Sequence, residues 1–463
     1  MKIYNTMTRQ KEELKPITDG IVKIYCCGPT VYNLIHIGNA RALCVFDTLR
    51  RYLEFRGYKV LYVQNFTDVD DKIIKKANEL GKTASEVSEN AIKEYFVDAQ
   101  GLNVRKADIH PKVTENMGII IDIVKTLIDK GYAYEADGDV YFETKKFPEY
   151  GKLSHMPLED LQAGARIEVG EKKRDPMDFA VWKAAKPGEP YWDSPFGKGR
   201  PGWHIECSAM SRHYIGDTID IHGGGSDLIF PHHENEIAQS ECATGSPLAN
   251  IWMHNGMLNV DNKKMSKSAG NFFMVRDLSD KYGYEPIRFM LLSVHYRSQL
   301  NYTIEVIESC KAALQRLYTC RDAMERVKSA AKDGEAGAQT LEAVKTARAD
   351  FITAMDDDFN TADGISVLFE LVRKINSALA SPDVTKGDVA AYYDEFTALT
   401  NVLGLLYNKE NDDIPAEVTD LVEQRRAARK AKDFALADAL RDKITALGYT
   451  VEETRQGTIV KKA

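Results

Sequence analysis

The sequence has no uninterrupted hydrophobic run long enough to cross a bilayer. The best candidate, Ile119 to Ile128, contains Asp122 and Lys125. The first residues, MKIYNTMTRQKEELKP, are polar and of mixed charge, and they do not resemble a signal peptide. These two absences argue against a membrane or secreted protein and predict a soluble protein of the cytoplasm.

The cysteine pattern of a disulfide-stabilised protein is also missing. The cysteines are odd in number, irregularly spaced and few for a chain of 463 residues. Reduced thiols, with a metal site among them, are therefore the better interpretation. The cysteines are Cys26, Cys27, Cys44, Cys207, Cys242, Cys310 and Cys320.

The chain as a whole lacks positive charge, since its formal net charge is −8. That value argues against a nucleic-acid partner for most of the surface. From Leu421 onward, however, ten Lys and Arg stand against six Asp and Glu, a local charge of +4. A basic end on an acidic body fits an RNA-contacting module, although most charge runs are only solvated surface.

The hydrophobic pattern predicts an α/β fold. With 44% hydrophobic residues the chain is no disordered protein, and its length suits several domains. Residues Ile21 to Gly28 predict a strand, Asn39 to Gly57 a helix and Lys59 to Phe66 a second strand, which implies a parallel sheet with a right-handed crossover. The pattern resumes later with a helix over Cys207 to Tyr214, a strand over Thr218 to His222, a helix over Pro231 to Cys242 and a strand over Ile251 to Met257.

Five segments follow from these patterns. We expect the two halves of the sheet domain at 1–110 and 202–303, separated by an insertion at 111–201 that is rich in Gly, Pro and charge in its later part. Residues 304–407 are almost wholly helical in pattern. The last segment, 408–463, predicts one basic helix over Ala416 to Leu447 and a hairpin over Tyr449 to Lys462.

Two motifs indicate nucleotide handling. The first strand leads through Gly28-Pro29-Thr30 to His36-Ile37-Gly38-Asn39, where a helix begins and its free N–H groups suit phosphate. The second motif is Lys264-Met265-Ser266-Lys267-Ser268, whose two ammonium groups can stabilise a departing pyrophosphate. The simpler alternatives are a histidine that caps an ordinary helix and a solvated basic loop.

Two further groups of residues carry chemistry. Gly223-Gly224-Gly225-Ser226-Asp227 follows a strand, where a glycine turn and a carboxylate can receive a ribose; a plain turn is the alternative. His232 and Glu236 have the i, i+4 spacing of metal ligands on a helix, and Cys27 and Cys207 are expected at the same edge of the sheet. Sequence alone does not pair these four, because a lone cysteine is usually a small hydrophobic residue.

The two nucleotide motifs resemble the HIGH and KMSKS motifs of class I aminoacyl-tRNA synthetases, with Asn39 in place of the final histidine of HIGH. The chain is similar, more closely, to the cysteinyl-tRNA synthetase family. The resemblance lies in YCCGPTVYNLIHIGN, TDVDDKI, KRDPMDFAVWK, GRPGWHIECSAM and DIHGGGSDLIFPHHENEIAQS. It implies a Rossmann-type catalytic domain with an insertion, an α-helical bundle and a small C-terminal anticodon-binding module.

The resemblance also implies roles for individual residues. Zinc would be held by Cys27, Cys207, His232 and Glu236, and Thr67 and Trp203 are candidates for lining the cysteine pocket, with core packing as the alternative. ATP with Mg²⁺ would be bound by Thr30, His36, Gly38, Asn39, Gly225, Asp227, Lys264 and Lys267, of which His36, Lys264 and Lys267 would be catalytic.

The implied activity is the joining of cysteine to tRNA at the expense of ATP, by a monomer without a membrane partner. Two alternatives stay open at this point. One is a related ligase that transfers cysteine to a small amino-sugar; the other is a non-catalytic paralogue that binds RNA or zinc. The helical bundle and the basic C-terminal segment favour tRNA as the acceptor.

Overall fold

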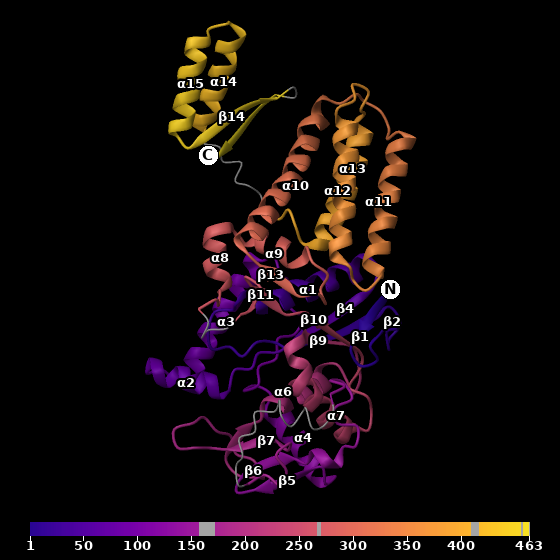
Figure 1. Ribbon diagram of the computed structural model, residues 1–463, viewed down its shortest axis with the longest axis vertical. Helices are drawn as coiled ribbons and strands as arrows, with labels where there is room; N and C mark the ends of the chain where they lie inside the picture. The colour runs from indigo at the N-terminus through magenta and orange to yellow at the C-terminus, as the bar shows by residue number, and fades with distance from the viewer. Residues whose placement is uncertain (157–171, 266–269, 409–415, 455–456, 463) are drawn as a thin grey trace. The chain divides into compact units, whose positions relative to one another are not determined.

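The computed structural model describes residues 1–156, 172–265, 270–408, 416–454 and 457–462 (Figure 1). The chain separates into two compact units, Met1–Leu406 and Tyr407–Ala463. The predicted α/β class is confirmed, because the first unit is built around a parallel sheet with helices packed on it. Within the described residues, no helix combines the length and the hydropathy required to cross a bilayer.

The central sheet has four parallel strands in the order β10-β9-β3-β4. They are β3 (Ile21–Cys26), β4 (Lys59–Gln64), β9 (Ile219–Gly225) and β10 (Ala249–Asn255). From β3 the chain crosses outward to β4, and from β9 it crosses outward to β10 on the other side. The strand order therefore reverses between β3 and β9, and ligands of such sheets bind at the carboxyl ends of the strands at that point.

Helix α1 (Ile37–Phe55) connects β3 to β4 and covers one face of the sheet. Its apolar positions Leu43, Phe46, Leu49 and Leu53 are all buried, as the period of the sequence predicts. Phe46 packs against β9 so closely that a Cβ on Gly223 would lie 2.2 Å from its ring. Packing against Phe46 therefore requires a glycine at position 223, whether or not a ligand binds there.

The insertion between β4 and β9 contains its own antiparallel sheet, in the order β5-β6-β7-β8. A hairpin turning at Asp137-Gly138 joins β5 to β6. The strands are β5 (Ala133–Ala136), β6 (Asp139–Phe142), β7 (Phe179–Ala184) and β8 (Gly199–Pro201), and the insertion also contains α4 (Met117–Asp129). The helices α2 (Asp71–Leu80) and α3 (Ala84–Gly101) precede residues 111–201, and α6 (Trp203–Tyr214) follows them.

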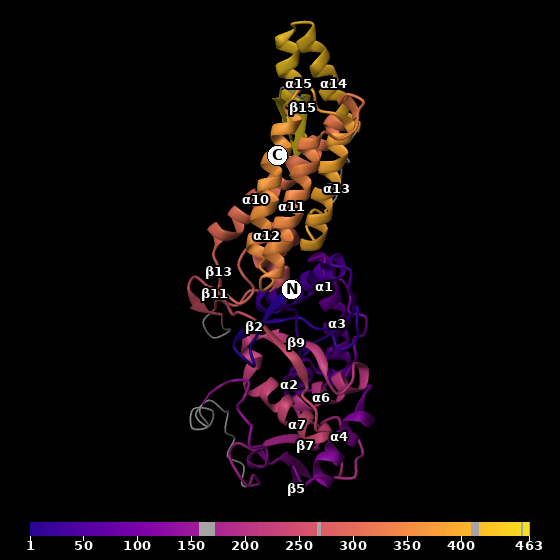
Figure 2. The same ribbon diagram turned by 90° about the vertical axis from the view of Figure 1, so that its right-hand side faces the viewer.

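Beyond β10 the chain forms a small sheet, two short helices and a helical bundle. The sheet has the order β12-β11-β13, with β11 at Leu258–Val260, β12 at Lys263–Lys264 and β13 at Leu300–Tyr302. The helices are α8 (Val275–Tyr282), α9 (Tyr284–Leu292), α10 (Ile304–Ala330), α11 (Ala338–Asp356), α12 (Thr361–Leu379) and α13 (Lys386–Leu403). The last four lie side by side as the bundle, and α13 packs directly on α1 (Figure 2).

The second unit differs from its prediction in one respect. One basic helix was expected over 416–447, but the structure has two helices, α14 (Ala416–Lys430) and α15 (Phe434–Ala446), packed on each other. The break is local: Lys432 has a positive φ of 62°, and the Asp433 side chain caps α15 by accepting from the Leu436 N–H at 3.1 Å. The predicted terminal hairpin is confirmed as β14 (Tyr449–Thr454) paired with β15 (Gly457–Lys462).

A buried carboxylate joins the bundle to the N-terminal hairpin of β1 (Lys2–Asn5) and β2 (Gln10–Glu13). Asp358 is fully buried and accepts hydrogen bonds from the Tyr4 N–H, the Tyr296 hydroxyl and Arg297 Nε at 2.7–2.8 Å. Its donors come from two segments that are far apart in the sequence, Tyr4 from one and the neighbours Tyr296 and Arg297 from the other. The carboxylate therefore fixes the tertiary arrangement around the N-terminus.

We predict that Asp358→Ala lowers the free energy of unfolding of the first unit by about 3–5 kcal/mol, because it leaves buried donors and a guanidinium without their acceptor. Asp357→Ala is the matched control, since that side chain is 66% exposed and contacts Lys11 at the surface. Its expected cost is below about 1 kcal/mol. Denaturant titration measures both values, and equal midpoints for the two variants would contradict the role given to Asp358.

Candidate active site and metal centre

Four side chains predicted to bind a metal come together at the carboxyl edge of the sheet. The Cys27 sulfur lies 3.6 Å from the Cys207 sulfur, 3.5 Å from His232 Nε2 and 3.3 Å from Glu236 Oε1. His232 Nε2 lies 3.0 Å from Glu236 Oε1, and the four ligand atoms are all within 4.8 Å of one another. These separations match the edges of a tetrahedron with metal–ligand bonds of about 2.0–2.3 Å.

The four ligands come from three parts of the fold. Cys27 directly follows β3, and its N–H donates to the Gly223 carbonyl of β9 at 3.2 Å. Cys207 lies on α6, with 2% of its surface exposed. Cys26 points to the opposite face, where it is fully buried in the core, as strand alternation predicts.

The other two ligands lie on a helical stretch that was predicted from Pro231. Its regular part, α7, spans Glu234–Thr244, and a turn over Ile229–His233 precedes it, where Phe230 alone interrupts the helical dihedrals. A proline ring restricts the residue before it to extended conformations, which explains the interruption. His232 and Glu236 still meet, because the residues between them continue as a helical turn.

The electrostatics of the cluster favour binding of a cation. The Cys27 thiol donates to the Cys207 sulfur and lowers the pKa of Cys207 to about 6. Burial raises the pKa of the Glu236 carboxyl, but His222 and His232 outweigh it and hold that pKa well below its usual value. Burial lowers the pKa of His232, whereas Glu236 and Cys207 raise it to a net value of about 10. Without a metal ion, a protonated His232 would offset the charge of the Cys207 thiolate and the Glu236 carboxylate; a metal ion bound there would displace that proton and take over the compensation.

Two histidines that the sequence analysis did not select orient these ligands. His222 Nε2 lies 2.8 Å from Glu236 Oε2, and His204 Nδ1 lies 2.9 Å from His232 Nδ1. A metal-bound histidine commonly donates its second ring N–H to such a partner, which fixes its orientation. In the sequence His204 precedes Cys207 by three residues on α6, and His222 lies in the middle of β9, but these positions alone do not show which ligand each histidine contacts.

A second possible ligand set shares two members with the first and consists of Cys27, His222, His233 and Glu236. It has a single thiol. The first set has two, and it leaves His222 and His204 as hydrogen-bond partners of its ligands. The residues present therefore fit a tetrahedral metal ion best at Cys27, Cys207, His232 and Glu236.

The two candidates for the cysteine pocket lie next to this cluster. The Trp203 ring is 38% exposed, and its centroid lies 4.3 Å from that of His232. Thr67 is buried, and its hydroxyl donates to the Glu206 carboxylate at 2.8 Å, one residue before Cys207. Glu206 itself was not predicted; burial raises the pKa of its carboxyl well above the usual range.

The HIGH-like motif forms the N-terminus of α1. His36 caps the helix, its Nδ1 accepting from the Asn39 N–H at 3.2 Å, while Asn39 Oδ1 accepts from the His36 N–H at 3.2 Å. His36 therefore does cap the helix, as the simpler alternative expected, and Asn39 completes the capping box. A Cβ on Gly38 would lie 2.9 Å from the His36 ring, so glycine is required here.

The segment that follows the KMSKS motif pairs with the HIGH-like motif. The Ile37 N–H donates to the Phe273 carbonyl at 3.2 Å, and the Val275 N–H donates to the Ile35 carbonyl at 3.0 Å. The Met265 methyl approaches the Gly38 position to 3.4 Å. Lys264 lies on β12, whereas Lys267 lies outside the described residues. The structure therefore brings the two motifs together through their described parts.

The remaining nucleotide candidates lie at the ends of β3 and β9. Gly225 ends β9, and Asp227 follows in a short 3-10 turn with its side chain exposed. Thr30 pairs with Thr67 in an isolated parallel bridge after β3. These positions flank the point where the strand order reverses, as a nucleotide site requires.

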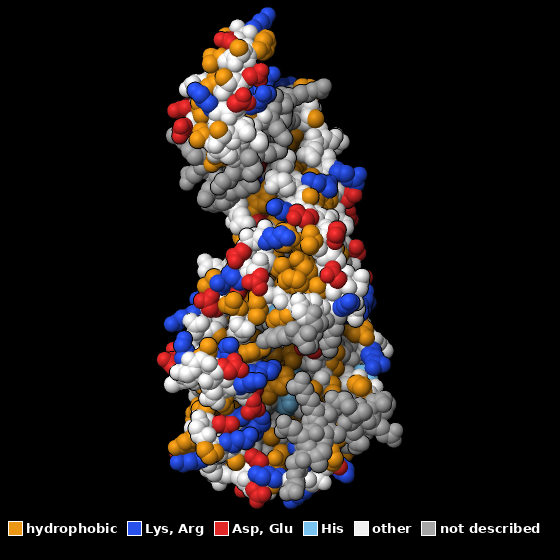
Figure 3. Space-filling model, turned by 60° about the vertical axis from the view of Figure 1, so that its left-hand side comes forward, with side chains coloured by type: hydrophobic (Ala, Val, Ile, Leu, Met, Phe, Trp, Pro, Cys, Tyr) orange, Lys and Arg blue, Asp and Glu red, His pale blue; other side chains and the backbone are white. Residues whose placement is uncertain are grey.

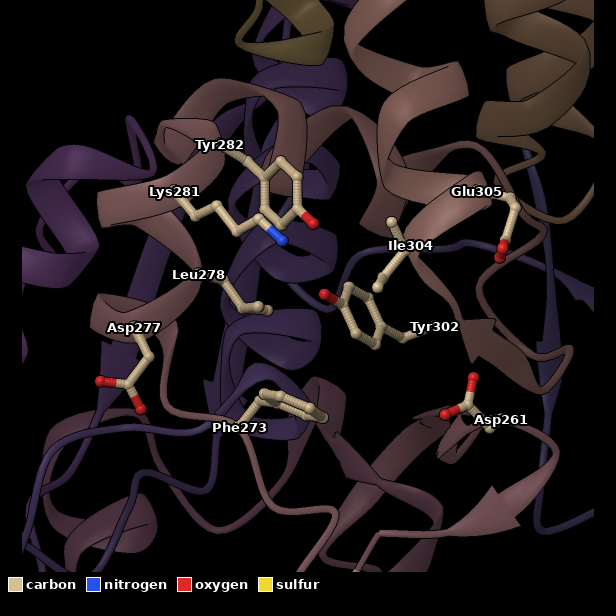
Figure 4. Close-up of a pocket in the computed structure, with 9 residues that line it drawn as sticks. All are labelled: Asp261, Phe273, Asp277, Leu278, Lys281, Tyr282, Tyr302, Ile304 and Glu305. Atoms are coloured by element: carbon tan, nitrogen blue, oxygen red, sulfur yellow. The ribbon is translucent and has the colours of Figure 1, made fainter.

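Two views show the surroundings of the motifs. A pocket of about 320 Å³ opens between α8, β13 and the start of α10, and Phe273 and Tyr302 lie in it (Figure 4). In the space-filling view, basic and acidic side chains are intermixed over the surface, and hydrophobic side chains gather near the middle of the face shown (Figure 3).

Comparison with known families defines the class of the fold and the site. Residues 13–312 match a family model described as the tRNA synthetases class I (C) catalytic domain. Residues 350–407 match the DALR domain, and residues 411–459 match the cysteinyl-tRNA ligase anticodon binding domain. The chain thus has the catalytic domain of a class I aminoacyl-tRNA synthetase.

Individual relatives define the family. A cysteine–tRNA ligase of Geobacillus thermodenitrificans is 55% identical over 463 residues, covering 100% of this chain and 99% of the relative. The cysteine–tRNA ligase of Clostridioides difficile is 53% identical, with 100% of both chains covered. The chain belongs to the cysteine–tRNA ligase family and is a class I aminoacyl-tRNA synthetase that joins cysteine to tRNA. These matches do not favour the amino-sugar ligase or the non-catalytic paralogue.

Solved structures support the fold. Mycobacterium tuberculosis methionyl-tRNA synthetase in complex with methionyl-adenylate aligns with a TM-score of 0.60 at 14% identity, covering 83% of this chain and 89% of that one. A putative arginyl-tRNA synthetase from Campylobacter jejuni aligns with a TM-score of 0.58 at 13% identity, covering 83% and 93%. Both similarities concern the fold alone.

We expect the purified protein to contain one metal ion per chain, which the sequence analysis predicts to be zinc. The double variant Cys207→Ser/His232→Ala should lose it, because two of the four ligands are removed. Cys242→Ser is the control, since Cys242 lies outside both ligand sets. Inductively coupled plasma mass spectrometry measures the content; metal-free active protein, or full retention in the double variant, would contradict the assignment.

Proposed function

We propose that this ligase works in two steps, with L-cysteine, ATP and tRNA(Cys) as substrates. An oxygen of the cysteine carboxylate attacks the α-phosphorus of ATP, which forms cysteinyl-adenylate and releases pyrophosphate. A hydroxyl of the terminal ribose of tRNA(Cys) then attacks the cysteinyl carbonyl, which forms the ester and releases AMP. The observation that supports the cysteine specificity is the cluster of Cys27, Cys207, His232 and Glu236 at the end of β3.

Selection of the thiol is the function that we assign to this cluster. A zinc ion held there would bind the sulfur of cysteine in preference to the oxygen of serine, a distinction that hydrogen bonds alone make poorly. Trp203 and Thr67 would border the bound amino acid from α6 and from the end of β4. The insertion at 111–201 is too short for a full hydrolytic editing domain, which fits selection of the thiol at the binding step.

ATP would bind across the ends of β3 and β9. His36, Gly38 and Asn39 offer a helix N-terminus and ring N–H to phosphate, and Gly225 and Asp227 suit the ribose. Lys264 and Lys267 would stabilise the charge that develops on pyrophosphate, with Mg²⁺ entering as part of the ATP substrate. The first step needs no general base, because the attacking carboxylate is already ionised. Thr30 would complete the nucleotide site.

The domains would share the work along the chain. We assign the catalytic domain to 1–110 and 202–303, the connective insertion to 111–201, the helical bundle to 304–407 and anticodon binding to 408–463. In the last segment Phe434 is 63% exposed, beside the positive-φ turn at Lys432. An exposed ring next to basic side chains is suited to stacking on an unpaired base. We further propose that the enzyme is a cytoplasmic monomer.

Cysteine-dependent ATP–pyrophosphate exchange tests the proposed selection. We expect exchange with cysteine and almost none with serine. Cys27→Ser should lower the rate of cysteine-dependent exchange by at least about 100-fold, because one of the four metal ligands is replaced. Cys26→Ala is the matched neighbour, since Cys26 is buried on the opposite face, and it should keep cysteine specificity. Equal exchange with cysteine and serine in the unmodified enzyme would contradict selection at this site.

Removal of the second unit tests the division of labour. We expect a chain that ends at Asn408 to keep cysteine activation almost intact, because the sheet and the metal cluster lie within Met1–Leu406. Charging of tRNA should fall by about 100-fold or more, since the assigned anticodon contacts are lost. Aminoacylation and exchange are measured on the same preparation. Near-normal charging by the shortened chain would show that the second unit does not read the anticodon.

A further inference from the structure

The HIGH-like motif and the segment after the KMSKS motif share a short antiparallel pairing. His36 stands opposite Met274 in this pairing, with backbone hydrogen bonds on both sides of it. The ring of Phe272 contacts the imidazole of His36, with centroids 4.9 Å apart and planes inclined by 62°. An aromatic side chain from the segment after the KMSKS motif thus contacts the histidine of the HIGH-like motif directly.

The hydrogen bonds of His36 define which ring nitrogen carries the proton. Nδ1 accepts from the Asn39 N–H, so it holds a lone pair, and in the neutral ring the proton is on Nε2. The contact with Phe272 lies on the ring itself and adds to this hydrogen bond in restraining the direction of the Nε2–H bond.

We propose that Phe272 is a positioning residue for His36: its ring holds the imidazole in the orientation that presents the Nε2–H to the phosphates of ATP. The inference rests on the proposed role of His36 in the first step. Edge-to-face contacts of aromatic rings contribute about 0.5–1.5 kcal/mol beyond their burial, which corresponds to a rate effect of about 2- to 13-fold. In this proposal Phe272 acts through His36 and not on the nucleotide itself.

The next residue provides a matched control. Phe273 follows Phe272 in the same segment, but its ring packs against Tyr302 with centroids 5.4 Å apart. It lines the pocket of Figure 4, where it faces Tyr302 and Leu278. Replacing either phenylalanine removes one ring from the same strand, and only Phe272 has its ring against His36.

The first experiment compares Phe272→Leu, Phe272→Tyr and Phe273→Leu in the full-length, metal-loaded enzyme. We expect Phe272→Leu to lower kcat for ATP–pyrophosphate exchange by about 3- to 10-fold, with the KM for cysteine unchanged. Phe272→Tyr keeps the ring and should restore kcat to within about 2-fold, and Phe273→Leu should change it by less than about 2-fold. Transfer of cysteine from preformed adenylate to tRNA should be unaffected by Phe272→Leu.

A double-mutant cycle distinguishes positioning from general loosening of the loop. In a His36→Ala background, measured by single-turnover adenylate formation, Phe272→Leu should cost less than about 2-fold, because its target is gone. The proposal is overturned if the full loss persists in that background, or if Phe273→Leu is as damaging. If His36→Ala alone leaves adenylate formation unchanged, the proposed role of His36 fails, and the role of Phe272 fails with it.

Discussion

The parallel pairing of β3 with β9 is the interaction on which the site depends. It aligns Tyr25 with His222 and Cys26 with Gly223, and it continues as the hydrogen bond from the Cys27 N–H. This register presents Cys27 to the metal cluster and buries Cys26 in the core. A shift by one residue would exchange the two cysteines between these faces. The same pairing sets the glycine-rich end of β9 beside the end of β3, where the strand order reverses.

Helix α1 transmits this arrangement to the rest of the first unit. At its N-terminus it presents His36, and along its length it carries Asp47, which accepts from Arg288 of α9 at 2.7 Å. Arg288 is fully buried and also donates to the Leu403 carbonyl at the end of α13. A buried guanidinium with this many acceptors is expensive to separate from its partners. The nucleotide motif and the bundle are therefore connected through α1, by the Asp47–Arg288 ion pair and also by Arg56, at the end of this helix, which pairs with Asp356 of α11.

Much of this was predictable from the sequence, because periodicity and motif spacing are local properties. The strand–helix–strand order at 21–64 and the i, i+4 pair of His232 and Glu236 both need only neighbouring residues. The break at Lys432 was missed, because it depends on the conformation of a single residue. His222 and His204 were missed for another reason: their partners come from other elements, so only the folded chain shows which ligand each orients.

The strand order has a consequence for the chain as it leaves the ribosome. β3 and β4 can pair as soon as α1 has formed, but the other edge of β3 must wait for β9, which is encoded after the whole insertion. At a synthesis rate of about 5–20 residues per second, the time between the synthesis of β3 and that of β9 is roughly 10–40 s. During this time an apolar strand edge is unpaired and the Cys27 thiol has none of its three partners. During this stage the nascent chain is susceptible to aggregation and to thiol oxidation. The stage ends when residue 236 has emerged from the ribosome and α7 can dock.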